Sequence, residues 1–191
     1  MSRRAAAVQQ TRRRIVDATL ELHAQQGIAA TSWDQIAARA GVGVGTVYRH
    51  FRSLDELVPA CGRVAMELLA VPDPSDAPAR FAGAEGLRAR LERLVGEVFA
   101  IYDRGAHVVR AARSEADVHP DVARRVAEIE AVLDALVDAA LDPLDVDVSD
   151  RRVTRAMLDL WTWSALREQG LDAAETVAAV SAMLACHLDR A

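Results

Sequence analysis

Residues 31–54 read TSWDQIAARAGVGVGTVYRHFRSL and contain two short helix patterns separated by glycine. Ser32 and Gln35 have the spacing of a capping box, which predicts a helix that begins there and ends at Gly41. A second helix pattern covers residues 44–50. Two short helices joined by a glycine-containing turn form the helix-turn-helix motif, whose second helix can enter the major groove of DNA.

The second of these helices has distinct inward and outward sides. At about 100° per residue, Val44, Val47 and Phe51 fall on one side and should pack inward. The other side and its flanks carry groups suited to nucleic acid: Gly45, Thr46, Arg49, Tyr48 and His50. Arg bonds guanine edges, hydroxyl groups donate to phosphates, and Gly allows the backbone to approach closely. An ordinary exposed helix of an all-α protein is the alternative that this spacing leaves open.

Residues 36–51, IAARAGVGVGTVYRHF, resemble the DNA-binding signature of the TetR family of bacterial transcriptional regulators, roughly I-A-x-x-A-G-V-S-x-G-T-x-Y-x-H/Y-F. The likeness extends upstream to Gly27 and Thr31, and the rest of the chain resembles the family only in layout. The resemblance implies two kinds of DNA contact. Phosphate contacts are implied for Thr31, Tyr48 and His50, and positions nearest the bases for Gly45, Thr46 and Arg49.

Two positions depart from the family pattern. Gly43 stands where Ser is usual, so a hydroxyl group is missing at the start of the second helix. Leu54 stands where the family commonly has a Lys that contacts phosphate, and Arg52, two residues earlier, is a candidate replacement for that charge. These departures affect individual contacts and leave the resemblance intact.

Charge is distributed unevenly along the 191 residues, whose formal net charge is −5. Residues 1–52 hold eight Arg against three acidic residues, a net +5, and the remaining residues have a net −10. A basic N-terminal part suits a polyanionic partner, although chance clustering of Arg gives the same count. A basic arm is a candidate for phosphate or minor-groove contacts, with a frayed, solvated terminus as the alternative. The arm consists of Arg3, Arg4, Arg12, Arg13 and Arg14.

Helical patterns recur along the chain without a convincing strand pattern, which predicts an all-α fold. A proline-rich linker at residues 71–79 separates two expected domains. Residues 9–70 are the helix-turn-helix DNA-binding domain with its connecting helix, and residues 80–191 are the ligand-binding and dimerisation domain. Helices in the second domain are expected near residues 84–103, 106–114, 120–141, 150–169 and 172–190.

Motifs of enzymes, metal sites and membrane segments are not found in the sequence. The histidines and cysteines lack zinc-ligand spacing, and no P-loop, dinucleotide fingerprint or G-x-S-x-G motif is present. We therefore expect no catalytic residue, no metal and no cofactor. The longest uncharged run, residues 176–188, is too short to span a bilayer, and no secretory signal is recognised. A soluble cytoplasmic protein without membrane contact is expected.

The last helix pattern indicates a homodimer. Residues 176–188 are uncharged on every side of a helix, and such a helix must be covered on two sides. A second copy of the chain is the simplest cover and gives a four-helix interface, in agreement with the dimer that the TetR resemblance implies. Burial inside the monomer is the alternative. The candidate interface residues are Trp163, Ala179, Met183 and Cys186.

Aromatic side chains at helical spacing are candidates for a ligand cavity in the second domain. Phe99 and Tyr102 lie three apart on one expected helix face, and His107 follows. Met157 and Trp161 lie four apart in the expected helix 150–169. Such walls suit a small, mostly apolar ligand that is neutral or anionic. Plain core packing is the alternative for all five residues.

Together these features predict a ligand-responsive, DNA-binding transcriptional regulator. We expect a repressor that an unidentified small-molecule inducer releases from an inverted-repeat operator in double-stranded DNA. The mechanism implied by the family is a two-state equilibrium, in which the ligand favours recognition helices wrongly spaced for adjacent major grooves. An activator or nucleoid-organising protein of the same fold stays open, as does an enzyme or carrier with an incidental helix-turn-helix motif.

Overall fold

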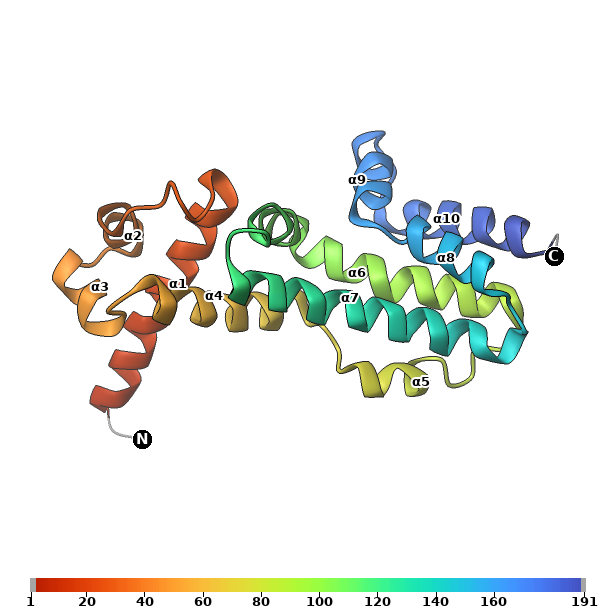
Figure 1. The fold of residues 1–191 in the computed structure, drawn as a ribbon, viewed down its shortest axis with the longest axis horizontal. Coiled ribbons are helices and arrows are strands. Elements are labelled where there is room, and N and C mark those ends of the chain that lie inside the picture. The colour runs from red at the N-terminus through yellow and green to blue at the C-terminus, as the bar shows by residue number, and fades with distance from the viewer. Residues whose placement is uncertain (1–2, 190–191) are drawn as a thin grey trace. The chain divides into compact units, whose positions relative to one another are not determined.

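The computed structural model describes residues 3–189, and every regular element in this part of the chain is a helix, which confirms the all-α prediction (Figure 1). The elements in chain order are α1 (Arg3–Gln26), α2 (Trp33–Ala40), α3 (Val44–His50), α4 (Leu54–Leu69), the 3-10 turn η1 (Pro74–Asp76), α5 (Ala77–Arg80), α6 (Gly86–Glu115), α7 (Pro120–Leu141), the 3-10 turn η2 (Asp142–Leu144), α8 (Val148–Met157), α9 (Leu160–Glu168) and α10 (Ala173–Leu188).

The described chain divides into two compact units. The first comprises the described residues up to Leu68 together with His107–Val126, and the second comprises Leu69–Ala106 and the described residues from Ala127 onward. The boundaries expected from the sequence, 9–70 and 80–191, stay a prediction. Residues 107–126 belong to the second expected domain but to the first compact unit.

The first unit is built on the predicted helix-turn-helix. Ser32 Oγ accepts a hydrogen bond from Gln35 N at 3.3 Å, and Gln35 Oε1 accepts one from Ser32 N at 2.9 Å, so the capping box is present. Gly41 ends α2 in the left-handed conformation with φ 64°, which L side chains rarely adopt. The inward side of α3 is buried, with Val47 and Phe51 fully inaccessible to solvent. Each such side chain stabilises the fold by roughly 1.5–3 kcal/mol.

The second unit has its core between α6 and α7. Leu91, Leu94 and Val98 on α6 are fully buried, as are Leu133 and Leu136 on α7. The separate helices expected at 84–103 and 106–114 are confirmed as the two parts of α6, which meet at Gly105, where the backbone is not helical (φ −174°, ψ 51°). The break that the sequence indicated is therefore a bend within α6.

The single helix expected at residues 150–169 is wrong, because the chain leaves the helical conformation between α8 and α9. Asp159 is extended (φ −73°, ψ 153°), and its carboxylate accepts a hydrogen bond from Trp161 N at 3.0 Å. This is an N-cap, which begins a new helix at Leu160. Met157 and Trp161 consequently lie on different helices rather than one turn apart on the same face.

None of the helices in residues 3–189 combines the length and the apolar composition that crossing a bilayer requires. Within the same residues, no group of three or more His, Cys, Asp or Glu side chains is arranged to hold a metal ion.

Candidate nucleic-acid interface

The recognition helix α3 presents a polar side to solvent. Gly45, Tyr48 and Arg49 are exposed, and Thr46 and His50 are half-buried. Arg49 Nη2 donates a hydrogen bond to Thr46 Oγ1 at 3.3 Å, so these two side chains lie together on the outer side. A Cβ atom added at Gly45 would meet no protein atom within 4 Å. The structure therefore brings together the outward residues that the helix periodicity indicated.

Tyr48 is held from one side by an aromatic neighbour on α2. The ring centroids of Trp33 and Tyr48 lie 5.0 Å apart at an interplanar angle of 31°. This contact limits the motion of the phenol ring, yet 46% of Tyr48 stays exposed. The contact with Trp33 thus holds the Tyr48 ring, and with it the hydroxyl group, at the edge of the polar side of α3.

The remaining predicted contact residues have local partners. The hydroxyl of Thr31 donates to Gly27 O at 2.7 Å, which ties it to the end of α1. Arg52 is exposed, and its backbone N–H donates to Glu56 Oε2 at 2.9 Å at the start of α4. Gly43 is the N-cap of α3 and has no side-chain capping bond, so the hydroxyl missing from the sequence is missing from the helix end.

Two arginines of α1 cap the C-terminal ends of α2 and α3. The sequence did not indicate this capping. Arg12 Nη1 donates to His50 O at 2.9 Å, and its guanidinium lies 4.0 Å from the centroid of the Phe51 ring. Arg14 Nη2 donates to Ala40 O at 2.5 Å and to Gly41 O at 3.2 Å. Both arginines therefore satisfy carbonyls that a helix C-terminus leaves without partners, one at α3 and one at α2.

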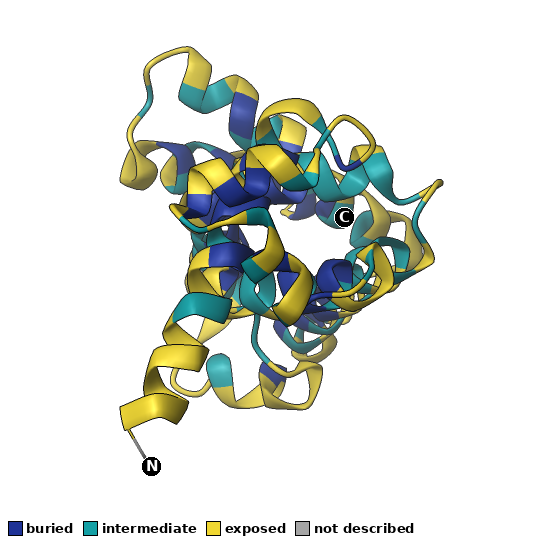
Figure 2. Ribbon diagram, turned by 90° about the vertical axis from the view of Figure 1, so that its left-hand side faces the viewer, coloured by how far each residue is buried: buried dark blue, intermediate teal, exposed yellow. Residues whose placement is uncertain are grey.

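The other arginines of the expected basic arm lie elsewhere. Arg13 pairs with Asp17 and Glu67, at 3.0 Å in each case, and all three side chains are largely exposed. Arg3 and Arg4 lie in the first turn of α1, which is exposed as far as residue 10 (Figure 2). The arm is thus an extension of α1, and only its first two arginines project beyond the packed part of the unit.

The charge state of His50 is set by its surroundings. Partial burial, followed by the nearby guanidiniums of Arg49 and Arg12, holds the pKa of His50 below its ordinary value. Its imidazole is therefore harder to protonate than that of a free histidine. The same two guanidiniums make the end of α3 electropositive.

The five predicted ligand residues differ in burial and are divided between the two units. Phe99 and Tyr102 are 1% exposed, and Tyr102 OH donates to Leu158 O at 3.1 Å. His107 is exposed and belongs to the first compact unit. Met157 is half-buried, whereas 60% of Trp161 is exposed. A cavity wall built from this set stays a prediction.

The four predicted interface residues are accessible to different degrees. Met183 is 45% exposed and Cys186 is exposed, while Ala179 is half-buried. Trp163 is half-buried, and its Nε1 donates to Asp103 Oδ1 at 3.1 Å. The side of α10 that carries Met183 and Cys186 is thus turned away from the buried stripe that includes Val180 and Leu184.

A helix-turn-helix motif with an exposed polar recognition face defines the chain as a DNA-binding transcriptional regulator. Residues 15–61 match the family described as "Bacterial regulatory proteins, tetR family". The transcriptional repressor KstR of Mycolicibacterium smegmatis is 30% identical over 158 residues, which cover 81% of this chain and 74% of that protein. The chain therefore belongs to the TetR family, as its signature indicated.

Solved structures share the fold over almost the whole chain. A TetR-family transcriptional regulator from Mesorhizobium loti matches with a TM-score of 0.66 at 19% identity, covering 100% of this chain and 98% of that one. The multidrug binding protein EbrR, complexed with malachite green, matches with a TM-score of 0.60 at 25% identity. That match covers 93% of this chain and 97% of EbrR. The first match concerns the fold alone.

Proposed function

We propose that the protein is a transcriptional repressor that binds an inverted-repeat operator as a homodimer and is released by a small molecule. The observation that carries the proposal is the outer side of α3, where Gly45, Thr46 and Arg49 are grouped without a carboxylate among them. Repression is supported by the KstR relative, which is a transcriptional repressor. The protein acts in this account by binding and not by turnover.

Base recognition is assigned to the outer side of α3 and phosphate contacts to its edges. Arg49 reads a base edge, and Gly45 lets the backbone of α3 approach the groove because no side chain intervenes. Tyr48, His50 and Arg52 neutralise or bond phosphates on the flanks of the helix. Thr31 lies in the turn between α1 and α2, and its hydroxyl, which donates to Gly27 O in the free protein, turns from that carbonyl to donate to a phosphate.

The proposed dimerisation is supported by the outer side of α10. Met183 leaves nearly half of a large apolar side chain in water, next to the exposed Cys186. A second copy that packs on this side removes that surface from water and relates two recognition helices by a two-fold axis. Two-fold symmetry in the protein calls for an inverted repeat in the DNA.

Release by a small molecule is supported by the EbrR complex, in which a protein of this fold holds malachite green. A ligand releases DNA only if it binds the state with unsuitable recognition-helix spacing more tightly than the other state. The proposed site of such a ligand is in the second unit.

Two substitutions on α3 test the assignment of contacts. Arg49→Ala should relax base preference at one position in each half-site and cost about 1–3 kcal/mol of binding free energy, if its contact is bidentate. Tyr48→Phe should weaken binding to all sequences about equally, because a phosphate contact carries no sequence information. Unchanged affinity and base preference in Arg49→Ala would show that the recognition face is placed on the wrong side of α3.

A further inference from the structure

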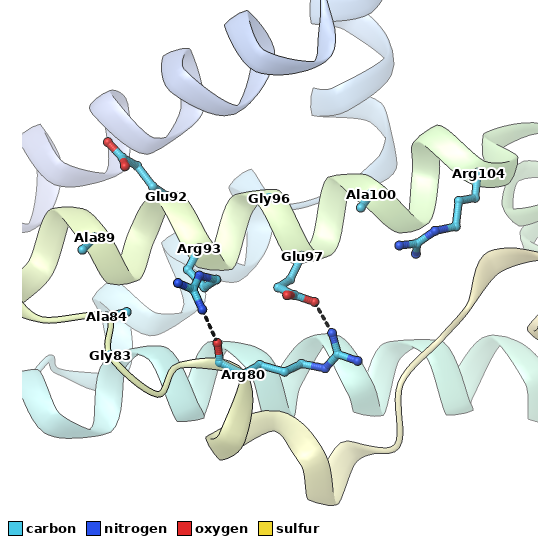
Figure 3. Close-up of a pocket in the computed structure, with 10 residues that line it drawn as sticks. All are labelled: Arg80, Gly83, Ala84, Ala89, Glu92, Arg93, Gly96, Glu97, Ala100 and Arg104. Carbon is cyan, nitrogen blue, oxygen red and sulfur yellow. Dashed lines mark hydrogen bonds and ion pairs between the residues drawn. The ribbon is translucent and has the colours of Figure 1, made fainter.

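A groove of about 530 Å³ opens between α5 and α6 in the second unit (Figure 3). Small residues, including Gly96 and Ala100, line it on successive turns of α6 and leave space open above the helix. A Cβ added at Gly96 would meet nothing within 4 Å, so the space above it is open. A volume of this size lies within the range of pockets that hold small organic ligands.

The charged side chains of the groove are unequally paired. Glu97 forms an ion pair with Arg80, which neutralises both groups. Arg93 Nη1 donates to Arg80 O at 2.8 Å, and Arg104 Nη1 donates to Leu69 O at 2.9 Å. Neither Arg93 nor Arg104 is paired with a carboxylate in the described part of the chain. Each guanidinium has five N–H donors and uses one of them on a backbone carbonyl.

The acidic residues do not cancel this positive charge. Glu97 is directed at Arg80, and Glu92, at the rim, points away from the three arginines in Figure 3. Arg80 Nε is buried and has no hydrogen-bond partner, which adds an unsatisfied donor at the same wall. The groove therefore holds two guanidiniums, those of Arg93 and Arg104, that no carboxylate of the described chain pairs with, beside the ion pair of Arg80 and Glu97.

The spacing of the two unpaired arginines indicates an elongated ligand. Arg93 and Arg104 are eleven residues apart on α6, which is about 16 Å along a helix axis. Gly96 and Ala100 lie between them and offer a smooth surface to an apolar body. A single inorganic ion occupies one end only, whereas a longer molecule with an anionic group uses both the guanidinium and the surface of small residues.

We propose that this groove binds an elongated organic anion, with a carboxylate or phosphate group at Arg93 or Arg104 and an apolar chain along Gly96 and Ala100. Guanidinium groups bind both carboxylates and phosphates through paired N–H donors, so one site can accept a ligand with either anionic group. The role of this ligand as the inducer rests on the proposed function, but its binding does not.

The test measures binding without DNA, by isothermal titration of the full chain with decanoate, decyl phosphate and decanol. Decanoate or decyl phosphate should bind, and the one that binds more tightly identifies the anionic group of the ligand. Decanol should bind at least tenfold more weakly than that anion. Arg93→Gln combined with Arg104→Gln should weaken binding of the anion at least tenfold. Ala100→Leu, which fills the groove and leaves every charge in place, should weaken binding of all probes.

Arg88→Gln is the matched control, because Arg88 is also on α6 but its side chain is 77% exposed and does not line the groove. Circular dichroism checks that each variant is folded. Equal binding of decanol and decanoate, binding unaffected by the double substitution, or no binding of any probe would overturn the proposal. DNA release is measured separately: an anion that binds here without releasing DNA contradicts the induction step of the proposed function and leaves the groove assignment standing.

Discussion

Replacing Arg12 with Ala should loosen the recognition helix although Arg12 is on α1. The side chain joins α1 to the C-terminus of α3 through the 2.9 Å hydrogen bond to His50 O and through its contact with the Phe51 ring. A hydrogen bond from a charged donor contributes about 1.5–3 kcal/mol, and a partly exposed cation–π contact adds roughly 0.5–1 kcal/mol. Because such contributions overlap and the guanidinium is partly solvated, we expect a net loss of about 2 kcal/mol in the free energy of unfolding.

The loss is measured by urea denaturation followed by circular dichroism, and hydrogen–deuterium exchange of residues 44–51 locates it on α3. Affinity for DNA should fall with it, because part of the binding free energy is spent on ordering α3. Arg13→Ala is the control: its ion pairs with Asp17 and Glu67 are exposed, so the free energy of unfolding should change by about 0.5 kcal/mol or less.

An alternative role for Arg12 gives a different pattern. If its guanidinium served mainly as a phosphate contact, Arg12→Ala would leave stability and exchange of α3 unchanged and reduce the salt dependence of DNA binding by about one phosphate contact. That pattern would refute the capping role derived from the structure.

Three further substitutions probe other parts of the account. Gly45→Ala should keep or raise stability by about 0.5 kcal/mol, because Ala favours helix and the site is open, yet reduce DNA affinity in a fluorescence anisotropy titration; unchanged affinity would remove Gly45 from the interface. DNA affinity should rise as pH falls through the lowered pKa of His50, because a phosphate favours the imidazolium. His50→Gln should flatten this pH dependence, and an equal slope in both proteins would exclude His50 as a phosphate contact. Met183→Glu should give a folded monomer by light scattering and circular dichroism, because it places a charge in the proposed interface; a dimer that persists would rule out this side of α10.

The local features of the motif were predictable because their signals lie within a few residues. Ser32 and Gln35 form the expected capping box, and α3 has the expected bounds, Val44–His50. The inward burial of Val47 and Phe51 follows from helix periodicity alone. Short-range chemistry therefore determines the recognition helix and its two sides.

Features that depend on distant partners were not predictable in the same way. Arg12 and Arg14 read as a basic arm, because their carbonyl partners lie 38 and 26 residues along the chain. The break at Asp159 was missed because the apolar periodicity continues across it, and only the cap geometry reveals it. Glu97 pairs with Arg80 in the α5–α6 groove, although the two residues are 17 positions apart in the chain. In each case the deciding contact is tertiary.

Whether α3 reads a specific operator can be measured by selecting bound fragments from a pool of random double-stranded DNA with the full chain as bait. We expect enrichment of one inverted repeat, with half-sites about one helical turn apart or a multiple of it, because two recognition helices related by a two-fold axis read adjacent major grooves. Binding of the enriched repeat should weaken steeply as salt rises. A pool that shows no enriched sequence after repeated selection, or that binds equally well to Arg49→Ala, would contradict the claim that α3 reads a specific operator.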